Sequence, residues 1–436
     1  MNHIVSKLLV YGSMPSDSIV MQLGEICRNA REHLQSKDEL ITRCFEQVKR
    51  ILEVSTDYAF NENLWQNYLT FLLITDENPF TLTSEKTGAK EGSVNIFVKN
   101  DFSEFMKLFH YDFSWLEEEL GINCFRVITN YSAIGKPELM YNKNVSEKVQ
   151  ALSRDLAAAS DVDTFYTVLT DFYRDFGVGM FGLNKAFRIA SNDSGDLRFL
   201  AINNMDKVML DDLIGYEIQK KKLIDNTKAF VEGRKANNCL LFGDSGTGKS
   251  TSIKAIVNEF YPQGLRMIEI YKHQFKDLSN VIARIKNRNY KFIIYMDDLS
   301  FEEFEIEYKF LKAVIEGGVE TKPENVLIYA TSNRRHLIKE TWNDRDDMET
   351  KAGIHRSDTI EEKLSLVNRF GVTINYSKPT QKEYFNIVIQ LARKAGIDLP
   401  EQELRLEANK WELSHGGISG RTAHQFVTYL LGRENQ

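Results

Sequence analysis

The chain has 436 residues, of which 42% are hydrophobic and 27% are charged, and its formal net charge is −7 at pH 7. This length exceeds a single typical core, so we expect two or three domains, and the composition is that of an ordinary soluble globular protein. The negative charge disfavours a protein that coats nucleic acid by bulk electrostatics, although it does not exclude a few lysines in a local groove.

Membrane, secreted and zinc-binding classes are also disfavoured. No apolar run reaches the roughly 18–20 residues that a bilayer span requires, and residues 1–7 lack the pattern of a secretory signal. The four cysteines are scattered without a C-x-x-C pair, and the eight histidines form no pair at metal-ligand spacing. We therefore expect a cytoplasmic protein with reduced, mostly buried thiols and no structural zinc.

Residues 1–184 carry long helical patterns, many aromatic residues and no recognisable catalytic motif, which predicts a mainly α-helical N-terminal domain of unknown role. Apolar residues at helical spacing are Leu64, Trp65, Tyr68, Leu69 and Leu72. We interpret them as a core face rather than as a platform on which bases stack. The helix should end before Pro79, because proline disfavours helix at the residue before it. A loop is expected over 87–93.

The pattern changes after this region. Segments 187–190 and 197–200 flank a polar stretch and predict a β-hairpin, so 185–204 is assigned as a hairpin linker. From 205 to 377, strands at 238–242, 265–270, 292–296, 326–330 and 372–376 alternate with helices, which predicts a parallel sheet covered on both faces. The basic triplet 220–222 is interpreted as a solvated helix face.

The segment 243–250 matches the phosphate-binding P-loop, G-x-x-x-x-G-K-[ST]. Its residues, with the one that follows, are Gly243, Asp244, Ser245, Gly246, Thr247, Gly248, Lys249, Ser250 and Thr251. Glycines let the backbone form a nest of N–H groups around phosphate oxygens. Lys249 is expected to reach the β- and γ-phosphates, and the Ser250 hydroxyl to hold Mg²⁺. An apolar strand precedes the loop and an amphipathic helix follows it, which is the context the motif requires.

Two later strands end in polar residues. The apolar strand at 292–296 is followed by Asp297, the candidate Mg²⁺ ligand, and Asp298, the candidate for polarising the attacking water. The strand at 326–330 leads to Asn333, which we expect to hydrogen-bond the γ-phosphate or the nucleophilic water. Beyond it, residues 341–363 are dense in charge and predict an exposed insertion.

The last region, 378–436, predicts a small helical lid. Thr380 and Glu383 have the spacing of a capping box, and an apolar helix face follows them. Two further helices are expected at about 400–414 and 419–431.

This ordered set of motifs resembles the AAA+ ATPases. Segment 364–371 resembles the family segment that carries the arginine finger, which corresponds to Arg369, and segment 417–423 resembles the lid segment whose sensor arginine corresponds to Arg421. Segment 213–217, with Gly215 and Tyr216, resembles the segment that lines the adenine pocket. More narrowly, most of the chain resembles a bacterial family catalogued as domain of unknown function 815, most specifically over 210–432.

The resemblance implies an α/β P-loop NTPase (AAA+) core with a C-terminal helical lid, preceded by the helical N-terminal domain. It implies ATP and Mg²⁺ as cofactors, ATPase activity that drives conformational change on a macromolecular partner, and a homo-oligomer when ATP is bound. One departure stands out, because Asp298 occupies a position where many AAA+ enzymes have glutamate. Aspartate is one methylene shorter, so hydrolysis is expected to be slow.

Two other interpretations stay open. One is a nucleotide-dependent switch or scaffold with negligible turnover. The other is a nucleic-acid loader or remodeller, which the resemblance permits but the acidic charge does not favour.

Overall fold

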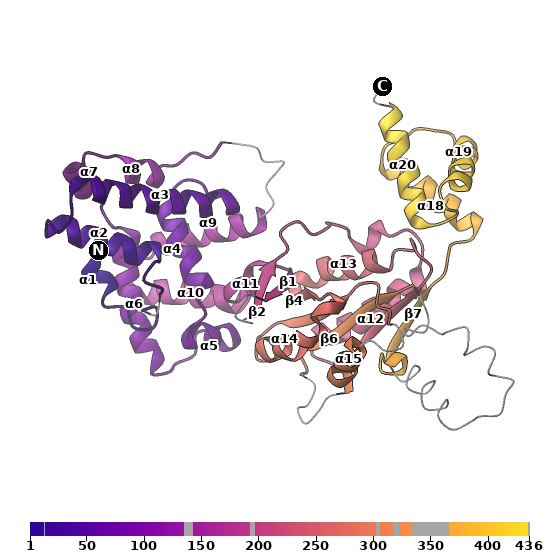
Figure 1. The fold of residues 1–436 in the computed structure, drawn as a ribbon, viewed down its shortest axis with the longest axis horizontal. Coiled ribbons are helices and arrows are strands. Elements are labelled where there is room, and N and C mark those ends of the chain that lie inside the picture. The colour runs from indigo at the N-terminus through magenta and orange to yellow at the C-terminus, as the bar shows by residue number, and fades with distance from the viewer. Residues whose placement is uncertain are drawn as a thin grey trace. The chain divides into compact units, whose positions relative to one another are not determined.

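The computed structural model describes residues 1–12, 14–134, 143–191, 197–301, 306–316, 323–333 and 366–434 (Figure 1). The chain divides into two compact units, Met1–Asn184 and Lys185–Gln436. The charge-dense segment 341–363 lies outside the described residues. Among the described residues, no helix combines the length and the hydropathy that crossing a membrane requires.

The first unit is built from helices, as expected from its sequence pattern. They are α1 (Asn2–Val5), α2 (Ile19–Arg31), α3 (Lys37–Tyr58), α4 (Leu64–Thr75), α5 (Pro79–Thr87), α6 (Val94–Phe109), α7 (Ser114–Leu120), α8 (Cys124–Thr129), α9 (Lys143–Ala157), α10 (Val162–Phe176) and α11 (Gly179–Leu183). Helix α4 ends ahead of Pro79, which opens α5 while Asn78 caps it with its side chain. The loop predicted at 87–93 separates α5 from α6.

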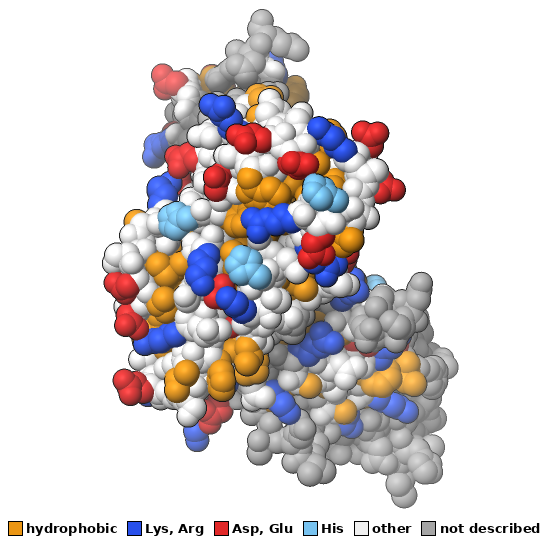
Figure 2. All heavy atoms as spheres, turned by 90° about the vertical axis from the view of Figure 1, so that its left-hand side faces the viewer, with side chains coloured by type: hydrophobic (Ala, Val, Ile, Leu, Met, Phe, Trp, Pro, Cys, Tyr) orange, Lys and Arg blue, Asp and Glu red, His pale blue; other side chains and the backbone are white. Residues whose placement is uncertain are grey.

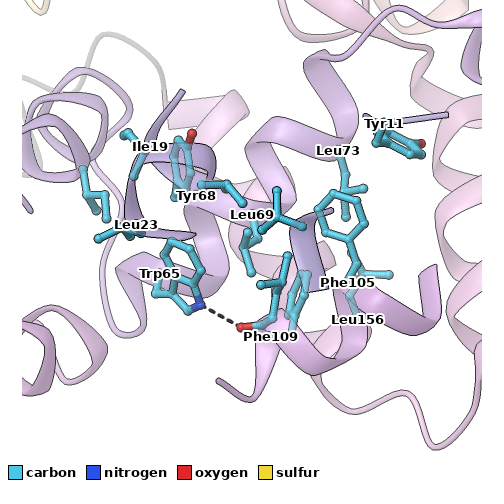
Figure 3. Close-up of a cluster of buried hydrophobic side chains, with 14 of the residues drawn as sticks. Tyr11, Ile19, Leu23, Trp65, Tyr68, Leu69, Leu73, Phe105, Phe109 and Leu156 are labelled. Atoms are coloured by element: carbon cyan, nitrogen blue, oxygen red, sulfur yellow. Dashed lines mark hydrogen bonds between the residues drawn. The ribbon is translucent and has the colours of Figure 1, made fainter. Parts of the chain in front are cut away.

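The aromatic residues of α4 form part of a hydrophobic core, which confirms the packing interpretation (Figure 3). Trp65 and Leu69 are at most 1% exposed, and the indole N–H of Trp65 donates to the carbonyl of Leu108 at 2.8 Å. Tyr68 is also buried. A base could not stack on side chains enclosed in this way without opening the core.

A buried carboxylate fixes the N-terminal segment to this core. Asp101 on α6 is fully buried, and its oxygens accept hydrogen bonds of 2.8–3.1 Å from the backbone N–H groups of Leu9, Val10 and Tyr11. These three N–H groups have no partner in a helix or a strand, so the Asp101 carboxylate supplies the hydrogen-bond acceptors that they need.

The face drawn in Figure 2 carries basic and acidic side chains interspersed with hydrophobic ones. Several large apolar residues of the first unit are exposed, among them Leu9 (61%), Phe45 (50%) and Ile96 (73%).

The second unit contains a seven-stranded sheet in the order β2-β1-β4-β5-β6-β3-β7. Its strands are β1 (Ala186–Ser191), β2 (Leu197–Ala201), β3 (Cys239–Gly243), β4 (Leu265–Glu269), β5 (Lys291–Met296), β6 (Val326–Ser332) and β7 (Val372–Tyr376). Strands β3, β4, β5, β6 and β7 are parallel, as predicted. The predicted hairpin is present, and β1 also pairs with β4, so the hairpin extends the sheet.

Helices accompany the strands and bury the sheet. They are α12 (Glu217–Val231), α13 (Lys249–Phe260), α14 (Leu278–Ile285) and α15 (Glu307–Glu316), with short 3₁₀ turns η2 (Leu210–Asp212), η3 (Tyr261–Gln263) and η4 (Lys272–Asp277). Leu241 and Tyr329 share one hydrophobic cluster with Ile256 of α13, while Leu240 and Ile328, which point to the opposite face, are buried too. Burial on both faces explains why these strands read as continuous apolar runs.

Three helices close the unit as α18 (Gln381–Lys394), α19 (Glu401–Ser414) and α20 (Gly420–Glu434). They enclose a hydrophobic cluster of their own that includes Tyr384, Val388 and Phe426. The predicted capping box is present, with Thr380 accepting from the N–H of Glu383 and Glu383 accepting from the N–H of Thr380.

We predict that Asp101→Asn destabilises the protein by about 1–3 kcal/mol, because the charge that accepts these bonds is lost and the Leu9 N–H would face an amide N–H₂ instead of carboxylate Oδ1. Urea titration gives the change in the free energy of unfolding. The matched control is Asp163→Asn, which alters an exposed ion pair with Lys99 (2.6 Å) and should shift stability by less than about 0.5 kcal/mol. Equal effects of the two variants would contradict an anchoring role for Asp101.

Candidate functional site

The P-loop leaves the end of β3 and runs into the N-terminus of α13. Gly243 has φ 131°, and a side chain there would meet the carbonyl oxygen of Tyr376 at 2.3 Å. Gly248 caps α13 with φ 90°, a left-handed conformation that glycine adopts without strain. The sequence therefore folds the loop tightly over the first turn of a twelve-residue helix, whose free N–H groups favour an anion.

Lys249 is the first residue of α13, and only 7% of it is exposed. Its ammonium donates to the carbonyl oxygens of Gly243 (2.9 Å) and Asp244 (2.7 Å) and to the side-chain oxygen of Asn333 (3.0 Å). Burial lowers the pKa of this lysine, and the carboxylates of Asp244, Asp298 and Asp297 oppose that shift. The lysine is thus held at the junction of the P-loop and β6.

Asp297 follows β5 and meets Ser250 of α13. The Ser250 hydroxyl donates to Asp297 Oδ1 at 2.8 Å, and the Thr331 hydroxyl donates to the same oxygen at 2.5 Å. Burial by itself raises the pKa of Asp297, but the hydrogen bonds from the hydroxyls of Thr331 and Ser250 and from the N–H of Asp298, with the nearby Tyr295 hydroxyl, outweigh it, so the pKa lies below its usual value. Asp297 is therefore a carboxylate at neutral pH.

Asp298 stands next to this cluster in an uncommon backbone conformation, with φ 49°. Its N–H donates to Thr331 Oγ1 at 2.9 Å, and its carboxylate accepts from Asn333 Nδ2 at 2.8 Å. Since the Asn333 side-chain oxygen accepts from Lys249, the asparagine amide links the lysine to the second carboxylate. All three residues predicted at the two strand ends therefore meet in one network.

These groups line a cavity of about 420 Å³. The P-loop contributes Ser245, Gly246, Thr247, Gly248, Lys249, Ser250 and Thr251; the strand ends contribute Asp297, Asp298, Thr331 and Asn333; the remaining lining residues are Asp212, Leu213, Ile214, Tyr216, Ile387, Leu391, Gly420, Arg421 and His424. Polar groups from the P-loop and the strand ends meet Leu213, Ile214 and two lid residues that are apolar. The cavity thus combines a phosphate-binding loop with apolar side chains.

The lid and the P-loop are hydrogen-bonded at two places. The Asp244 carboxylate accepts from the N–H of Lys378 at 2.8 Å, just ahead of α18, and the carbonyl of Gly246 accepts from the N–H of Arg421 at 3.1 Å. Tyr216, itself left-handed at φ 59°, donates its hydroxyl to the carbonyl of Ser377 at 2.9 Å. The segment between β7 and the lid is therefore fixed by side chains of the site.

Four of the predicted site residues do not line the cavity, namely Gly215, Gly243, Asp244 and Arg369. Gly215 is a positive-φ turn residue beside Tyr216, and Asp244 contacts the lid segment instead. Arg369 is half-buried in the turn before β7, where its N–H donates to the carbonyl of Leu366 at 3.2 Å.

Sequence reasoning missed several lining residues. Thr331 lies in β6 two positions before Asn333, which follows the strand, and two positions is the repeat of a strand's side chains. His424 lies three positions after Arg421, one helical turn along α20. Ile387 and Leu391 belong to the apolar helix face predicted after Glu383, and they also line the cavity.

The residues present fit a magnesium-bound nucleoside triphosphate. A hydroxyl and a carboxylate oxygen 2.8 Å apart, from Ser250 and Asp297, are the hard oxygen donors that Mg²⁺ prefers. The backbone of a P-loop at a helix N-terminus, with a lysine at its base, suits phosphates. Apolar lining residues such as Ile214 and Ile387 suit a planar base.

A family profile described as "Protein of unknown function (DUF815)" matches residues 183–434, more than half of the chain. The chain belongs to this family. Its second unit has the mostly parallel α/β core expected from the sequence, which carries the P-loop and is followed by a helical lid. No curated protein sequence gives a significant match to the chain.

Solved structures similar to the chain include the Thermotoga maritima RuvB Holliday junction branch migration motor. Its identity is 17% and its TM-score 0.36, over 51% of this chain and 64% of that one. Two RuvB mutants from the same organism have identities of 16% and 14% and TM-scores of 0.36 and 0.32, covering 52% and 51% of this chain and 65% and 72% of theirs. The chain thus spans 64% of the length of the first of these proteins.

We predict that Asp244→Ala frees the segment ahead of the lid, because the N–H of Lys378 loses its acceptor. Hydrogen exchange at that amide should accelerate by about tenfold or more, since an unbonded exposed amide is no longer protected. Asp206→Ala is the control, because that carboxylate pairs with Lys254 (2.7 Å) in the same unit. Unchanged exchange at Lys378 in the first variant would show that Asp244 does not hold the segment.

Proposed function

We propose that the protein is a cytoplasmic, Mg²⁺-dependent AAA+ ATPase that couples ATP hydrolysis to conformational change on a macromolecular partner. The observation that supports this most is the convergence of the P-loop, the two carboxylates after β5, Asn333 and a lid arginine around one cavity. Each of these groups alone has an ordinary structural explanation. Their meeting in one place is what a phosphoryl-transfer site requires.

In this proposal the residues divide the work of positioning and charge stabilisation. Backbone N–H groups of the P-loop hold the phosphates, and Lys249 exchanges carbonyl acceptors for phosphate oxygens, with which its hydrogen bonds are stronger. Ser250 and Asp297 would hold Mg²⁺, which would neutralise charge on the phosphate oxygens. Asp298 accepts a proton from the attacking water. Asn333, which is hydrogen-bonded to the Asp298 carboxylate, orients that water.

Two arginines complete the proposed site. Arg421 lines the cavity from the lid of the same subunit, and we assign it to sensing the nucleotide. Arg369 lies outside the cavity of its own subunit, and we assign it as a finger that reaches the nucleotide of a neighbour. A planar, permanently charged guanidinium suits either task. The second assignment requires a homo-oligomer when ATP is bound.

The division of labour along the chain is also a proposal. We assign 1–184 to holding the macromolecular partner, 185–204 to a hairpin linker, 205–377 to the nucleotide-binding domain and 378–436 to the lid. No described residue of 1–184 is among those that line the nucleotide cavity, which supports the first of these assignments.

A second candidate function is a nucleotide-dependent switch with negligible turnover. The short side chain of Asp298 favours it, because the Asp298 carboxylate already contacts Asn333 at 2.8 Å and cannot extend further without backbone movement. Steady-state phosphate release by the wild-type protein distinguishes the two candidates. No release above background at any protein concentration would leave the switch.

We predict that Lys249→Ala weakens ATP binding at least about tenfold, roughly 1.4 kcal/mol, because the main counter-charge of the phosphates is lost. Titration with a fluorescent ATP analogue measures the dissociation constant. The companion variant Asp298→Asn should retain nucleotide and Mg²⁺ while nearly abolishing turnover, and Asp297→Asn should lose Mg²⁺ dependence instead. Undiminished affinity in a folded Lys249→Ala protein contradicts the phosphate-binding role of the loop.

We predict that turnover per subunit rises with protein concentration and that Arg369→Ala loses turnover while retaining ATP. Mixing Arg369→Ala with Lys249→Ala should restore part of the activity, because the first supplies an intact P-loop and the second an intact finger. Phosphate release over a concentration series, with sedimentation of the same samples, makes the measurement. A monomer with concentration-independent turnover and no rescue on mixing excludes the trans arrangement.

A further inference from the structure

Thr331, near the end of β6, contacts three consecutive residues that follow β5. Its hydroxyl donates to Asp297 Oδ1 at 2.5 Å and accepts from the N–H of Asp298 at 2.9 Å, and its backbone carbonyl accepts from the N–H of Leu299 at 2.7 Å. Thr331 is only 2% exposed. One buried residue therefore fixes the side chain of the first carboxylate and the backbone of the second.

The backbone of Asp298 needs such support. Its φ of 49° is positive, which makes it one of five non-glycine residues with this property in the part of the chain that the structure describes. A side chain in that region carries a steric penalty, and such conformations persist where surrounding contacts determine them. The hydrogen bonds of the Asp298 N–H and the Leu299 N–H fix the peptide groups on either side of the Asp298 Cα.

The conformation places the Asp298 carboxylate against Asn333, the next residue but one after Thr331. Alternate residues of a strand point to the same side, so the hydroxyl of Thr331 and the amide of Asn333 approach the carboxylates together. Thr331 fixes the backbone of Asp298 and the rotamer of Asp297, whereas Asn333 hydrogen-bonds the Asp298 carboxylate and Lys249.

We propose that Thr331 is a positioning residue that holds the rotamer of the Mg²⁺-binding carboxylate Asp297 and the left-handed backbone that aims the short Asp298 side chain into the cavity. The proposal rests on the function proposed above and adds a residue to it. A hydroxyl serves both purposes, because one atom donates to the Asp297 carboxylate and accepts from the Asp298 N–H, which also donates to Asp297 Oδ1 at 3.2 Å. Valine has the shape of threonine and can do neither.

The experiment compares Thr331→Val and Thr331→Ser with a matched control, Thr227→Val. Thr227 is also fully buried, and its hydroxyl contacts the carbonyl of Leu223 and the hydroxyl of Tyr329 on the same strand β6, each at 2.8 Å. The control removes a buried threonine hydroxyl from the same unit without touching the carboxylates. It therefore reports what the loss of such a hydroxyl does to stability alone.

Three quantities are measured for each variant: the affinity for a fluorescent ATP analogue with and without Mg²⁺, the Mg²⁺ dependence of phosphate release, and the thermal unfolding midpoint. In Thr331→Val the Mg²⁺ concentration for half-maximal binding should rise and kcat should fall, each by about 10- to 100-fold, as for other residues that orient metal ligands. Nucleotide affinity without Mg²⁺ should stay unchanged. Thr331→Ser should restore both properties, and Thr227→Val should lower only the unfolding midpoint.

The outcomes separate the two proposals. A wild-type protein that binds no nucleotide contradicts the proposed function. Wild-type-like Mg²⁺ dependence in Thr331→Val, or the same changes in Thr227→Val, overturns the role of Thr331 and leaves the proposed function standing. If valine prevents folding by pressing a methyl against the N–H of Asp298, Thr331→Ala removes the hydroxyl without that contact and is measured in the same way.

Discussion

The register of the parallel strands β3, β5 and β6 is the constraint on which the site depends. Phe242 pairs with Ser332 and Met296 pairs with Ala330, so the P-loop and the two polar strand ends leave the sheet at one edge. Side chains of a strand alternate between faces, and a slip of one residue in β6 would turn both Thr331 and Asn333 away from the carboxylates. Burial on both faces of the sheet opposes such a slip, because it would carry every apolar side chain of the strand to the wrong side.

Charge within the cavity is balanced by a small number of groups. Asp298 is joined to Lys249 through the Asn333 amide, and Asp297 is joined to Asp298 through the Thr331 hydroxyl, so neither carboxylate contacts the ammonium directly. The hydroxyl and amide groups between them keep the carboxylates and the ammonium close without forming a direct ion pair. A buried direct ion pair would be costly to separate when a ligand has to replace one of its partners. The hydroxyls of Ser250 and Thr331 hold Asp297 as a carboxylate despite its burial.

Much of this architecture could be predicted from the sequence, because the strands and helices have clear patterns and the P-loop has little freedom. The five strands of the parallel core and the three lid helices lie within a few residues of the expected positions. The carboxylates and Asn333 could be identified because each follows an apolar strand in a chain that also carries a P-loop. The hydrogen bonds that join them were not predictable. Threonine is common in strands, and the contacts of Thr331 with Asp297 and Asp298 arise only from the pairing of β5 with β6.

Contacts made by Asp244 and by lid residues were also beyond the sequence pattern. The P-loop motif leaves the position of Asp244 unspecified, and its partner Lys378 is distant in the chain. Ile387 and Leu391 show the same limit in another form. A helical repeat identifies the apolar side of α18, but it cannot tell which residues on that side contact the lid core and which contact the cavity.

The two hydrogen bonds between the P-loop and the lid, at Asp244 and Gly246, have a thermodynamic consequence. Ligand affinity and conformation are thermodynamically linked. If a bound nucleotide stabilises one orientation of the lid, then that orientation increases the affinity for nucleotide by the same free energy. A load applied to the lid by another molecule would therefore change how long the nucleotide stays bound. Under the proposed function, the loop that binds the phosphates is also hydrogen-bonded to the lid, so a change at the lid and a change at the nucleotide would each affect the other.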